Sequence, residues 1–295
     1  MKLAYLIIAH NQPKLLQRLV NAIDDPRNDI FIHIDKKSNI DEFSGITSVH
    51  SKIFFCPTRI NVRWGHISQP ETELVLMSYA HDCGPYDYYH LLSGIDYPLH
   101  SQDYIHSFME SHNGAEYIGF GGGQLDKRRD YYWLFTKDYK TKNPLLSLFT
   151  KCVRHSALII QKVLHFKRHW DFELRKGCNW FTISNACLEY VISRKDFVMH
   201  NFRYIACVDE IFLQTLIWNS PFRDKIFNQE NEYDSCMREI DWSRGNPYIW
   251  KESDFPYLST SKRFFCRKVS LDNRKLLDLL DRKIAKENTL KHSQS

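Results

Sequence analysis

An acidic pair in the second half of the chain, Asp209-Glu210, is followed by basic residues at Arg238 and at Arg267-Lys268. A transferase that uses a nucleotide-sugar needs a carboxylate to accept the proton of the attacking hydroxyl, and positive charge to stabilise the departing diphosphate. Many such enzymes take this charge from a metal ion held by an Asp-x-Asp triplet, which is absent from this sequence. If the protein catalyses this chemistry, side-chain cations are the natural substitute for the metal.

The composition fits an ordinary folded enzyme. Hydrophobic residues make up 43% of the 295 residues, which excludes a generally disordered chain. The net charge of +5 fits an anionic ligand or an anionic membrane surface, and without a binding motif it does not indicate nucleic acid. The 8 cysteines include no Cys-x-x-Cys pair. This spacing argues against a structural zinc site and favours reduced thiols in a cytosol.

Strand and helix patterns alternate in the first third of the chain. Apolar runs predict buried strands and helical periodicity predicts helices, in the order Leu3–Ala9 (strand), Pro13–Ile23 (helix), Asp29–Ile34 (strand), Ile53–Phe55 (strand), Pro70–Cys83 (helix) and Tyr88–Leu92 (strand). Such alternation is typical of an α/β fold with a mostly parallel sheet. The first run is too short to span a membrane and lacks a cleavage site, so it is interpreted as a strand rather than a targeting signal.

Polar residues directly follow three of the predicted strands. His10 follows the first, Asp35 the second, and the segment Ser93–Asp96 comes after the strand that ends near Leu92. Ligands of open α/β sheets bind at the carboxyl ends of the strands. We therefore expect these residues to lie near a ligand.

The segment from Pro144 to His165 predicts an amphipathic helix. Basic residues surround its apolar face: Lys151, Arg154, Lys162, Lys167 and Arg168. One interpretation is a surface helix with a solvated basic face. The other is a peripheral membrane contact through residues 144–169. Elsewhere in the second half, we expect a loop at Gly121–Gly123, a strand at Thr182–Ser184 and a helix at Asp209–Ile217.

Several sequence blocks resemble, in the same order, those of the core-2/I-branching β-1,6-N-acetylglucosaminyltransferases, a family that includes the peptide O-xylosyltransferases. Leu91–Leu99 resembles the family's Ser-Gly-x-Asp-aromatic-Pro signature, and further blocks lie at 32–37, 64–68, 209–210 and 265–269. The resemblance extends from about Leu3 to Val269. It implies a GT-A type Rossmann-like glycosyltransferase fold with a mostly parallel central sheet. It also implies inverting transfer from a UDP-sugar without a metal.

The resemblance also suggests roles for individual residues. Glu210 resembles the family's catalytic base, and Arg238 and Lys268 resemble the residues that bind the UDP diphosphate. His10 and Asp35 fall where the family contacts the nucleotide. Two further candidates are Asp96, in the signature loop near the donor, and Trp180, which is a candidate for stacking on the acceptor sugar.

Each role has a simpler structural alternative. Asp209 could cap a helix while Glu210 favours the positive end of its dipole. Lys268 could belong to a solvated face, and Asp35 could be a turn residue after a strand. Similarly, His10 could be a loop or core histidine and Trp180 a core residue. A hydrolase that uses the acidic pair is disfavoured because neighbouring helical residues point about 100° apart.

The sequence thus predicts a single catalytic domain over 1–295. We expect a nucleotide-binding half at about 1–120, an acceptor and catalytic half at about 121–270, and a charged helical tail at 271–295. The expected reaction is metal-independent transfer from a UDP-sugar, with GlcNAc as the first choice, to a glycan acceptor that is lipid-linked in bacterial surface polysaccharide synthesis. A xylosyl donor and a catalytically inactive UDP-sugar-binding module are the alternatives. The start at the first strand favours a cytoplasmic enzyme, peripheral at the inner face of the membrane.

Overall fold

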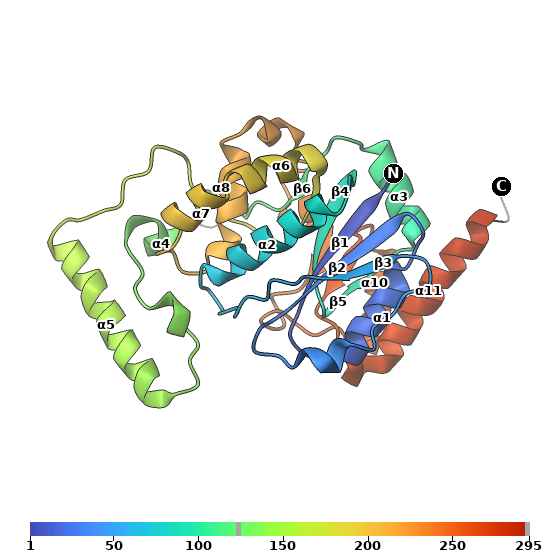
Figure 1. Cartoon of the computed structure of the whole chain (residues 1–295), viewed down its shortest axis with the longest axis horizontal. Helices are drawn as coiled ribbons and strands as arrows, with labels where there is room; N and C mark the ends of the chain where they lie inside the picture. The colour runs from blue at the N-terminus through green and yellow to red at the C-terminus, as the bar shows by residue number, and fades with distance from the viewer. Residues whose placement is uncertain (122–124, 293–295) are drawn as a thin grey trace.

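The computed structural model describes residues 1–121 and 125–292, and its main feature is a six-stranded sheet (Figure 1). The strand order is β3 (Lys52–Phe55), β2 (Asn28–Ile34), β1 (Leu3–Ala9), β4 (Tyr88–Ser93), β7 (Phe181–Ser184) and β6 (Tyr117–Ile118). The first four strands are parallel, and β7 is antiparallel to both β4 and β6. The predicted α/β fold with a mostly parallel sheet is therefore confirmed.

Helices cover both faces of the sheet because β1 and β2 are apolar on both sides. Alternate residues of β1 point to opposite faces, so Ala4 and Leu6 join one core while Leu3, Tyr5 and Ile7 join the other. The first core is closed by α2 (Ser68–Asp82), α6 (Asn185–Ser193) and α8 (Phe212–Trp218), and the second by α1 (Pro13–Ile23) and α3 (Gln102–Ser111). Because both faces of the sheet are buried in apolar cores, polar functional side chains are expected at the ends of the strands.

A second, three-stranded sheet joins segments that are far apart in the sequence. It consists of β5 (Asp96–Pro98), β9 (Phe265–Arg267) and β8 (Arg238–Ile240), with β9 in the centre. A third core lies between this sheet and the helices α10 (Phe255–Thr260) and α11 (Arg274–His292). The pairing of β5 with β9 places Asp96 directly opposite Arg267.

The remaining described helices are α4 (Asp126–Asp130), α5 (Pro144–Val163), α7 (Lys195–Asn201) and α9 (Glu232–Cys236). The helix predicted at Asp209–Ile217 is divided, because a 3-10 turn at Val208–Glu210 precedes α8 and Ile211 separates the two. Glu210 therefore lies in a turn rather than inside a helix. Part of the predicted Gly121–Gly123 loop and the end of the 271–295 tail lie outside the described residues.

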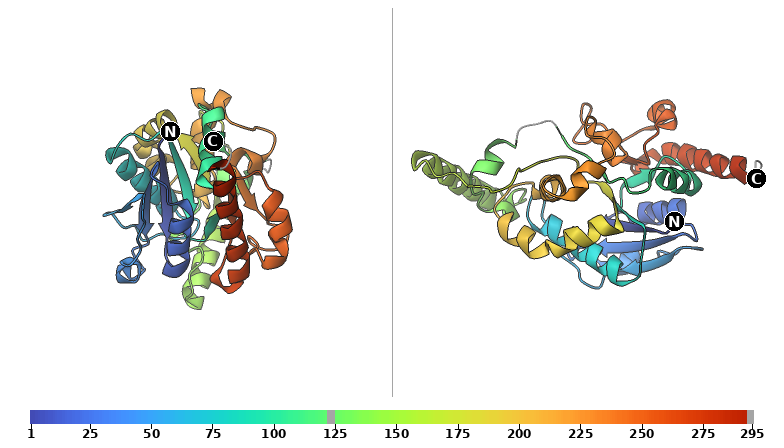
Figure 2. Two further views of the ribbon diagram at one scale, coloured as in Figure 1. Left: turned by 90° about the vertical axis from the view of Figure 1, so that its right-hand side faces the viewer. Right: turned by 90° about the horizontal axis from the view of Figure 1, so that it is seen from above.

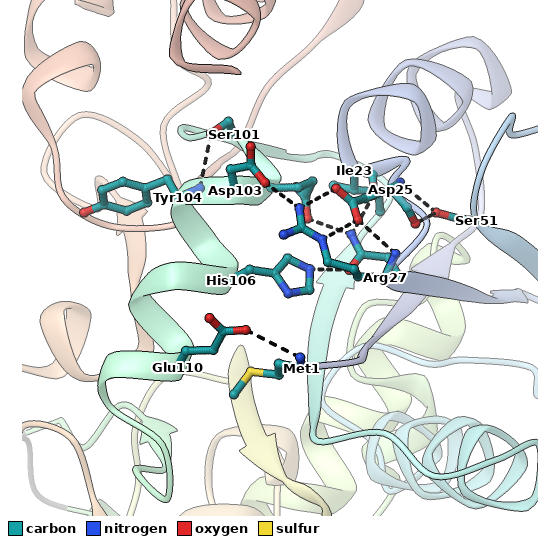
Figure 3. A network of polar contacts seen from close by, with 12 residues as sticks. Met1, Ile23, Asp25, Arg27, Ser51, Ser101, Asp103, Tyr104, His106 and Glu110 are labelled. Atoms are coloured by element: carbon teal, nitrogen blue, oxygen red, sulfur yellow. Dashed lines mark hydrogen bonds and ion pairs between the residues drawn. The ribbon is translucent and has the colours of Figure 1, made fainter. Parts of the chain in front are cut away.

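The amino ends of the parallel strands carry a network of paired polar groups (Figure 3). The Arg27 guanidinium lies 2.7 Å from carboxylate oxygens of both Asp25 and Asp103. Next to it, the His106 ring lies 2.8 Å from the side-chain oxygen of Asn28. These contacts hold α3 against the loop that leads into β2.

Two ends of the molecule are occupied by long helices. Figures 1 and 2 both show α5 projecting from the body at one end, with α11 at the other. Among the described residues, no helix has the length and apolar character needed to cross a bilayer.

Candidate active site

The predicted base, Glu210, presents its carboxylate beside the arginine of another element. Its side chain is 42% exposed, and its Oε2 lies 3.1 Å from Nη1 of Arg128, which lies in α4. The main-chain oxygen of Glu210 accepts a 2.9 Å hydrogen bond from the amide of Gly177. The turn and this bond fix the backbone, while the carboxylate remains open to a substrate hydroxyl.

A buried acidic cluster lies directly behind Glu210. Gln69 donates a 2.7 Å hydrogen bond to Oδ2 of Asp209. Asn179, with its amide oriented to donate, lies 3.0 Å from Oε1 of Glu73 and 3.2 Å from the main-chain oxygen of Asp209. Burial, followed by the charge of Glu210, raises the pKa of Asp209 to about 7. Burial also raises the pKa of Glu73 well above its ordinary value, with Asp209 acting in the same direction. Asp209 is half-buried with its Oδ1 atom buried, whereas the Glu210 side chain is 42% exposed.

The basic side of the site is built around Arg267 on β9. Its Nη1 lies 2.6 Å from Oδ1 of Asp96, and its guanidinium stacks on the Trp180 ring with the carbon 4.2 Å from the centroid. The amide of Ser93 donates a 2.8 Å bond to the other oxygen of Asp96. The signature loop at Ser93–Asp96 therefore positions the arginine, and the indole limits its movement.

Lys268 is a half-buried cation next to Arg267. Its ammonium has no hydrogen bond or ion pair within residues 1–121 and 125–292. Desolvation, then the charges of Arg267 and Lys140, lower the pKa of Lys268, and Asp96 opposes them. The ammonium of Lys140 lies 3.5 Å above the ring of Trp64. Lys268, Arg267 and Lys140 thus form a cation cluster in which, within the part of the chain that the structure describes, the only ion pair is that of Arg267 with Asp96.

The acidic and basic sides are joined by consecutive residues. Asn179 contacts Glu73 and Asp209, and its neighbour Trp180 contacts Arg267. Because adjacent residues cannot lie far apart, the groups behind the base and the cation cluster are close in space. The structure therefore brings two distant sequence blocks to one site.

His10 and Asp35 lie at the carboxyl ends of β1 and β2 but differ in accessibility. Desolvation lowers the pKa of exposed His10; Lys37 and Arg267 add to this shift, and Asp35 opposes it. The nucleotide contact of His10 stays a prediction. Asp35 is buried, accepts a 2.9 Å bond from the amide of Lys37 and lies 3.2 Å from its ammonium. Its carboxylate shapes the turn after β2, as the structural alternative anticipated.

Arg238 does not lie where a diphosphate ligand could reach it. Its side chain is fully buried, and its guanidinium donates to the main-chain oxygens of Cys236, Leu91 and Phe181 at 2.9–3.2 Å. It stacks on the Phe265 ring at 4.5 Å. The structure does not support the predicted ligand role for Arg238, because β8, the edge strand next to β9, directs this side chain toward main-chain oxygens of β4 and β7.

Two other predictions change in detail. Asp96 is fully buried and pairs with Arg267, so its carboxylate is not accessible at the surface where a donor was expected. Trp180 is half-buried, packs against the first core with one part of its surface and holds Arg267 with another. The packing alternative for Trp180 is therefore confirmed, and its stacking on an acceptor sugar stays a prediction.

Sequence reasoning missed Arg128 and Lys140. Both lie between Gly121 and α5, in a stretch without a recognisable block, and only the folded chain places them beside Glu210 and Trp64. The run Lys127-Arg128-Arg129 was the available signal. Within the described ranges, no three His, Cys, Asp or Glu residues converge on a point where they could bind a metal ion.

Comparison with known proteins identifies the family. The family model described as Core-2/I-Branching enzyme matches residues 3–256. Xylosyltransferase 2 of Rattus norvegicus is 24% identical and Xylosyltransferase 1 of Homo sapiens 23% identical, each across 95% of this chain. The aligned region covers 33% and 30% of these relatives, so the chain spans about a third of their length. The chain therefore belongs to the Core-2/I-Branching enzyme family.

Proposed function

We propose that the protein is an inverting glycosyltransferase that moves a sugar from a UDP-sugar to a hydroxyl of a glycan acceptor. The observation that supports this best is the exposed Glu210 carboxylate beside a cation cluster, linked through Asn179-Trp180. A single displacement needs one base and a charge-stabilised leaving group. The site offers both groups.

In the proposed reaction, Glu210 removes the proton of the acceptor hydroxyl as its oxygen attacks the anomeric carbon. The new carbon–oxygen bond forms on the face opposite the departing UDP, so the anomeric configuration inverts. The bond to the diphosphate breaks with its electron pair, and Lys268 and Arg267 stabilise the resulting charge. An arginine can bind phosphate oxygens through two N–H groups, whereas a lysine acts as a point charge. Arg267 thereby replaces Arg238 in the proposed diphosphate pair.

Arg128 and Trp180 have supporting roles in this proposal. Arg128, 3.1 Å from Glu210, orients the carboxylate by an ion pair in this proposal. Trp180 presents part of its ring beside Arg267, where it can stack on a sugar. His10, at the end of β1, is proposed to contact the nucleotide.

The proposed donor is UDP-GlcNAc, and UDP-xylose is the second candidate because the relatives reported above are xylosyltransferases. We propose a lipid-linked glycan of a bacterial surface polysaccharide as the acceptor, which would place the enzyme at the inner face of the cytoplasmic membrane. No metal is proposed, since Lys268 and Arg267 supply the positive charge.

The proposal is tested by measuring UDP release from UDP-GlcNAc, UDP-xylose, UDP-glucose and UDP-galactose, with and without EDTA. We expect one donor to be hydrolysed slowly without an acceptor, at a rate that EDTA does not change. Loss of activity in EDTA and recovery with manganese would contradict the metal-free mechanism. UDP binding without release from any donor, including in the presence of acceptor glycans, would support the inactive binding module.

A further inference from the structure

The helix α5 has its polar and apolar faces reversed relative to an ordinary surface helix. Its buried residues are Thr150 and Arg154, whereas Leu145 is 80% exposed and Val163 70% exposed. A surface helix normally turns its apolar stripe toward the core. The apolar face of α5 therefore does not stabilise the protein's own core.

Polar contacts hold the inner face of α5 against the preceding chain. Gln161 exchanges hydrogen bonds with the main chain of Tyr132 at 2.8 and 3.1 Å. Arg154 donates to the oxygen of Leu134 and lies 4.5 Å above the Tyr139 ring. These contacts fix which face points outward. Arg154 thus belongs to the inner face, which removes it from the predicted basic surface.

The outward face combines an apolar stripe with positive charge. At about 100° per residue, six exposed apolar side chains lie within a sector about 120° wide, and Leu146, which is less exposed, flanks it. We call this set the apolar stripe: Leu145, Leu148, Phe149, Ile159, Ile160 and Val163. The exposed residues Lys151 and Lys162 lie along one side of it, and the sequence from Tyr139 to Trp170 contains no acidic residue. The surface is thus complementary to an apolar layer with negatively charged groups at its edge.

The place of α5 in the molecule supports the same partner. Figures 1 and 2 show the helix at one end of the molecule, away from the main sheet. The chain leading to it also reaches the candidate site, since Lys140 lies over Trp64 and Arg128 pairs with Glu210. A flat surface that binds α5 would therefore lie near the side of the protein where the site is built.

We propose that α5 is an interfacial anchor that lies on an anionic lipid membrane, with the apolar stripe among the acyl chains and Lys151 and Lys162 at the headgroups. A helix in this position binds through buried apolar area and attraction to anionic lipids without crossing the bilayer. The orientation of the site toward a lipid-linked acceptor rests on the proposed function, whereas membrane binding does not.

The experiment is flotation of the full chain with phosphatidylcholine vesicles, with and without phosphatidylglycerol. We expect binding to the anionic vesicles only, and weakening by salt. Replacing Lys151 and Lys162 by Gln should weaken binding about fivefold per charge. The triple change Leu148→Ser, Phe149→Ser and Ile160→Ser should weaken it at least about tenfold. Unchanged thermal unfolding would show that these variants are folded.

Matched controls come from the body of the protein. Val49 is 85% exposed and Lys52 is exposed, both far from α5 in the sequence, so Val49→Ser and Lys52→Gln should leave flotation unchanged. Equal losses in these controls would overturn the assignment to α5. A second outcome would also overturn the assignment to a membrane anchor. In it, the wild-type protein fails to float, and the apolar triple variant abolishes self-association of the chain in solution.

Two native cysteines provide a local readout. Cys152 is exposed on α5, and Cys83 is exposed at the end of α2. A polarity-sensitive fluorophore on Cys152 in a Cys83→Ser background should shift to the blue on anionic vesicles. The same label on Cys83 in a Cys152→Ser background should not. A shift at Cys83 alone would place the lipid contact on the body and refute the proposal. Because neither measurement needs activity, failure of the proposed function would leave both results interpretable.

Discussion

The two ends of the parallel strands collect similar residue types but use them differently. At the amino ends, Arg27 is neutralised by Asp25 and Asp103 (Figure 3), and a cavity of about 520 Å³ is lined by these groups. At the carboxyl ends, Lys268 lies beside Arg267 and forms no ion pair among the residues that the structure describes, and the charge of Arg267 contributes to lowering the pKa of Lys268. Paired charges stabilise a fold, whereas a cluster of like charges costs stability. Cavity size alone therefore does not locate the candidate site, and the uncompensated cations are the feature on which the proposed diphosphate site rests.

The largest expected effect is on catalysis. Replacing Glu210 by Gln keeps the shape of the side chain but removes the proton acceptor, so turnover should fall by at least about a hundredfold. UDP affinity, measured by calorimetry, should stay close to that of the wild type because the cation cluster is intact. Near-normal turnover would show that another residue acts as the base. It would also weaken the contrast between the two ends of the parallel strands.

The next effect concerns stability and separates Arg238 from the cations of the site. Arg238→Met leaves the main-chain oxygens of Leu91, Phe181 and Cys236 without this donor, so the free energy of unfolding should fall by about 2–4 kcal/mol. Denaturant unfolding measures this loss. UDP affinity of the folded protein should be unchanged, and a large loss of affinity would restore the ligand role that the sequence suggested.

A smaller effect is expected on ligand affinity. Lys268→Ala removes one charge-assisted contact to the diphosphate, so UDP binding should weaken by roughly 1.5–3 kcal/mol. Lys268 is a cleaner test than Arg267, because loss of Arg267 also leaves buried Asp96 without its partner. The exposed Lys262, in the same segment, provides the control. Equal weakening by Lys262→Ala would mean that UDP affinity depends on the overall positive charge of this segment and not on a direct contact with Lys268.

The pH dependence of stability tests the acids beneath the base. Burial and Glu210 raise the pKa of Asp209 from 3.8 to about 7, so in this range the folded state holds a proton that the unfolded chain has released. Stability should therefore fall as pH rises from about 4 to 7. Asp209→Asn should remove part of this fall, on the order of 2 kcal/mol. An unchanged slope in denaturant unfolding at several pH values would contradict the assignment.

The smallest effect is expected at the amino ends. Arg27 is 38% exposed, so its ion pairs are screened by solvent and Arg27→Gln should cost at most about 1 kcal/mol of stability. UDP affinity and turnover should not change. A marked loss of turnover would show that the network in Figure 3 is coupled to the site, contrary to the separation described above.

The sequence by itself determined the layered core and several of the strand-end residues. The apolar run at Leu3–Ala9 and the helical spacing at Pro13–Ile23 match β1 and α1, because burial on both faces of a strand, or on one face of a helix, leaves a direct pattern. His10 and Asp35 follow from the same rule, since parallel strands end at one edge of the sheet.

Only the tertiary structure decided which charged residues face a ligand. Arg238 and Arg267 have the same chemistry and both lie on short strands, yet one is buried among main-chain oxygens and the other lies at the site. Strand alternation predicts the face to which a side chain points, but it does not predict which other elements cover that face. Likewise, the apolar spacing of α5 predicted a helix, but whether its stripe faces inward depends on long-range packing that no local pattern records.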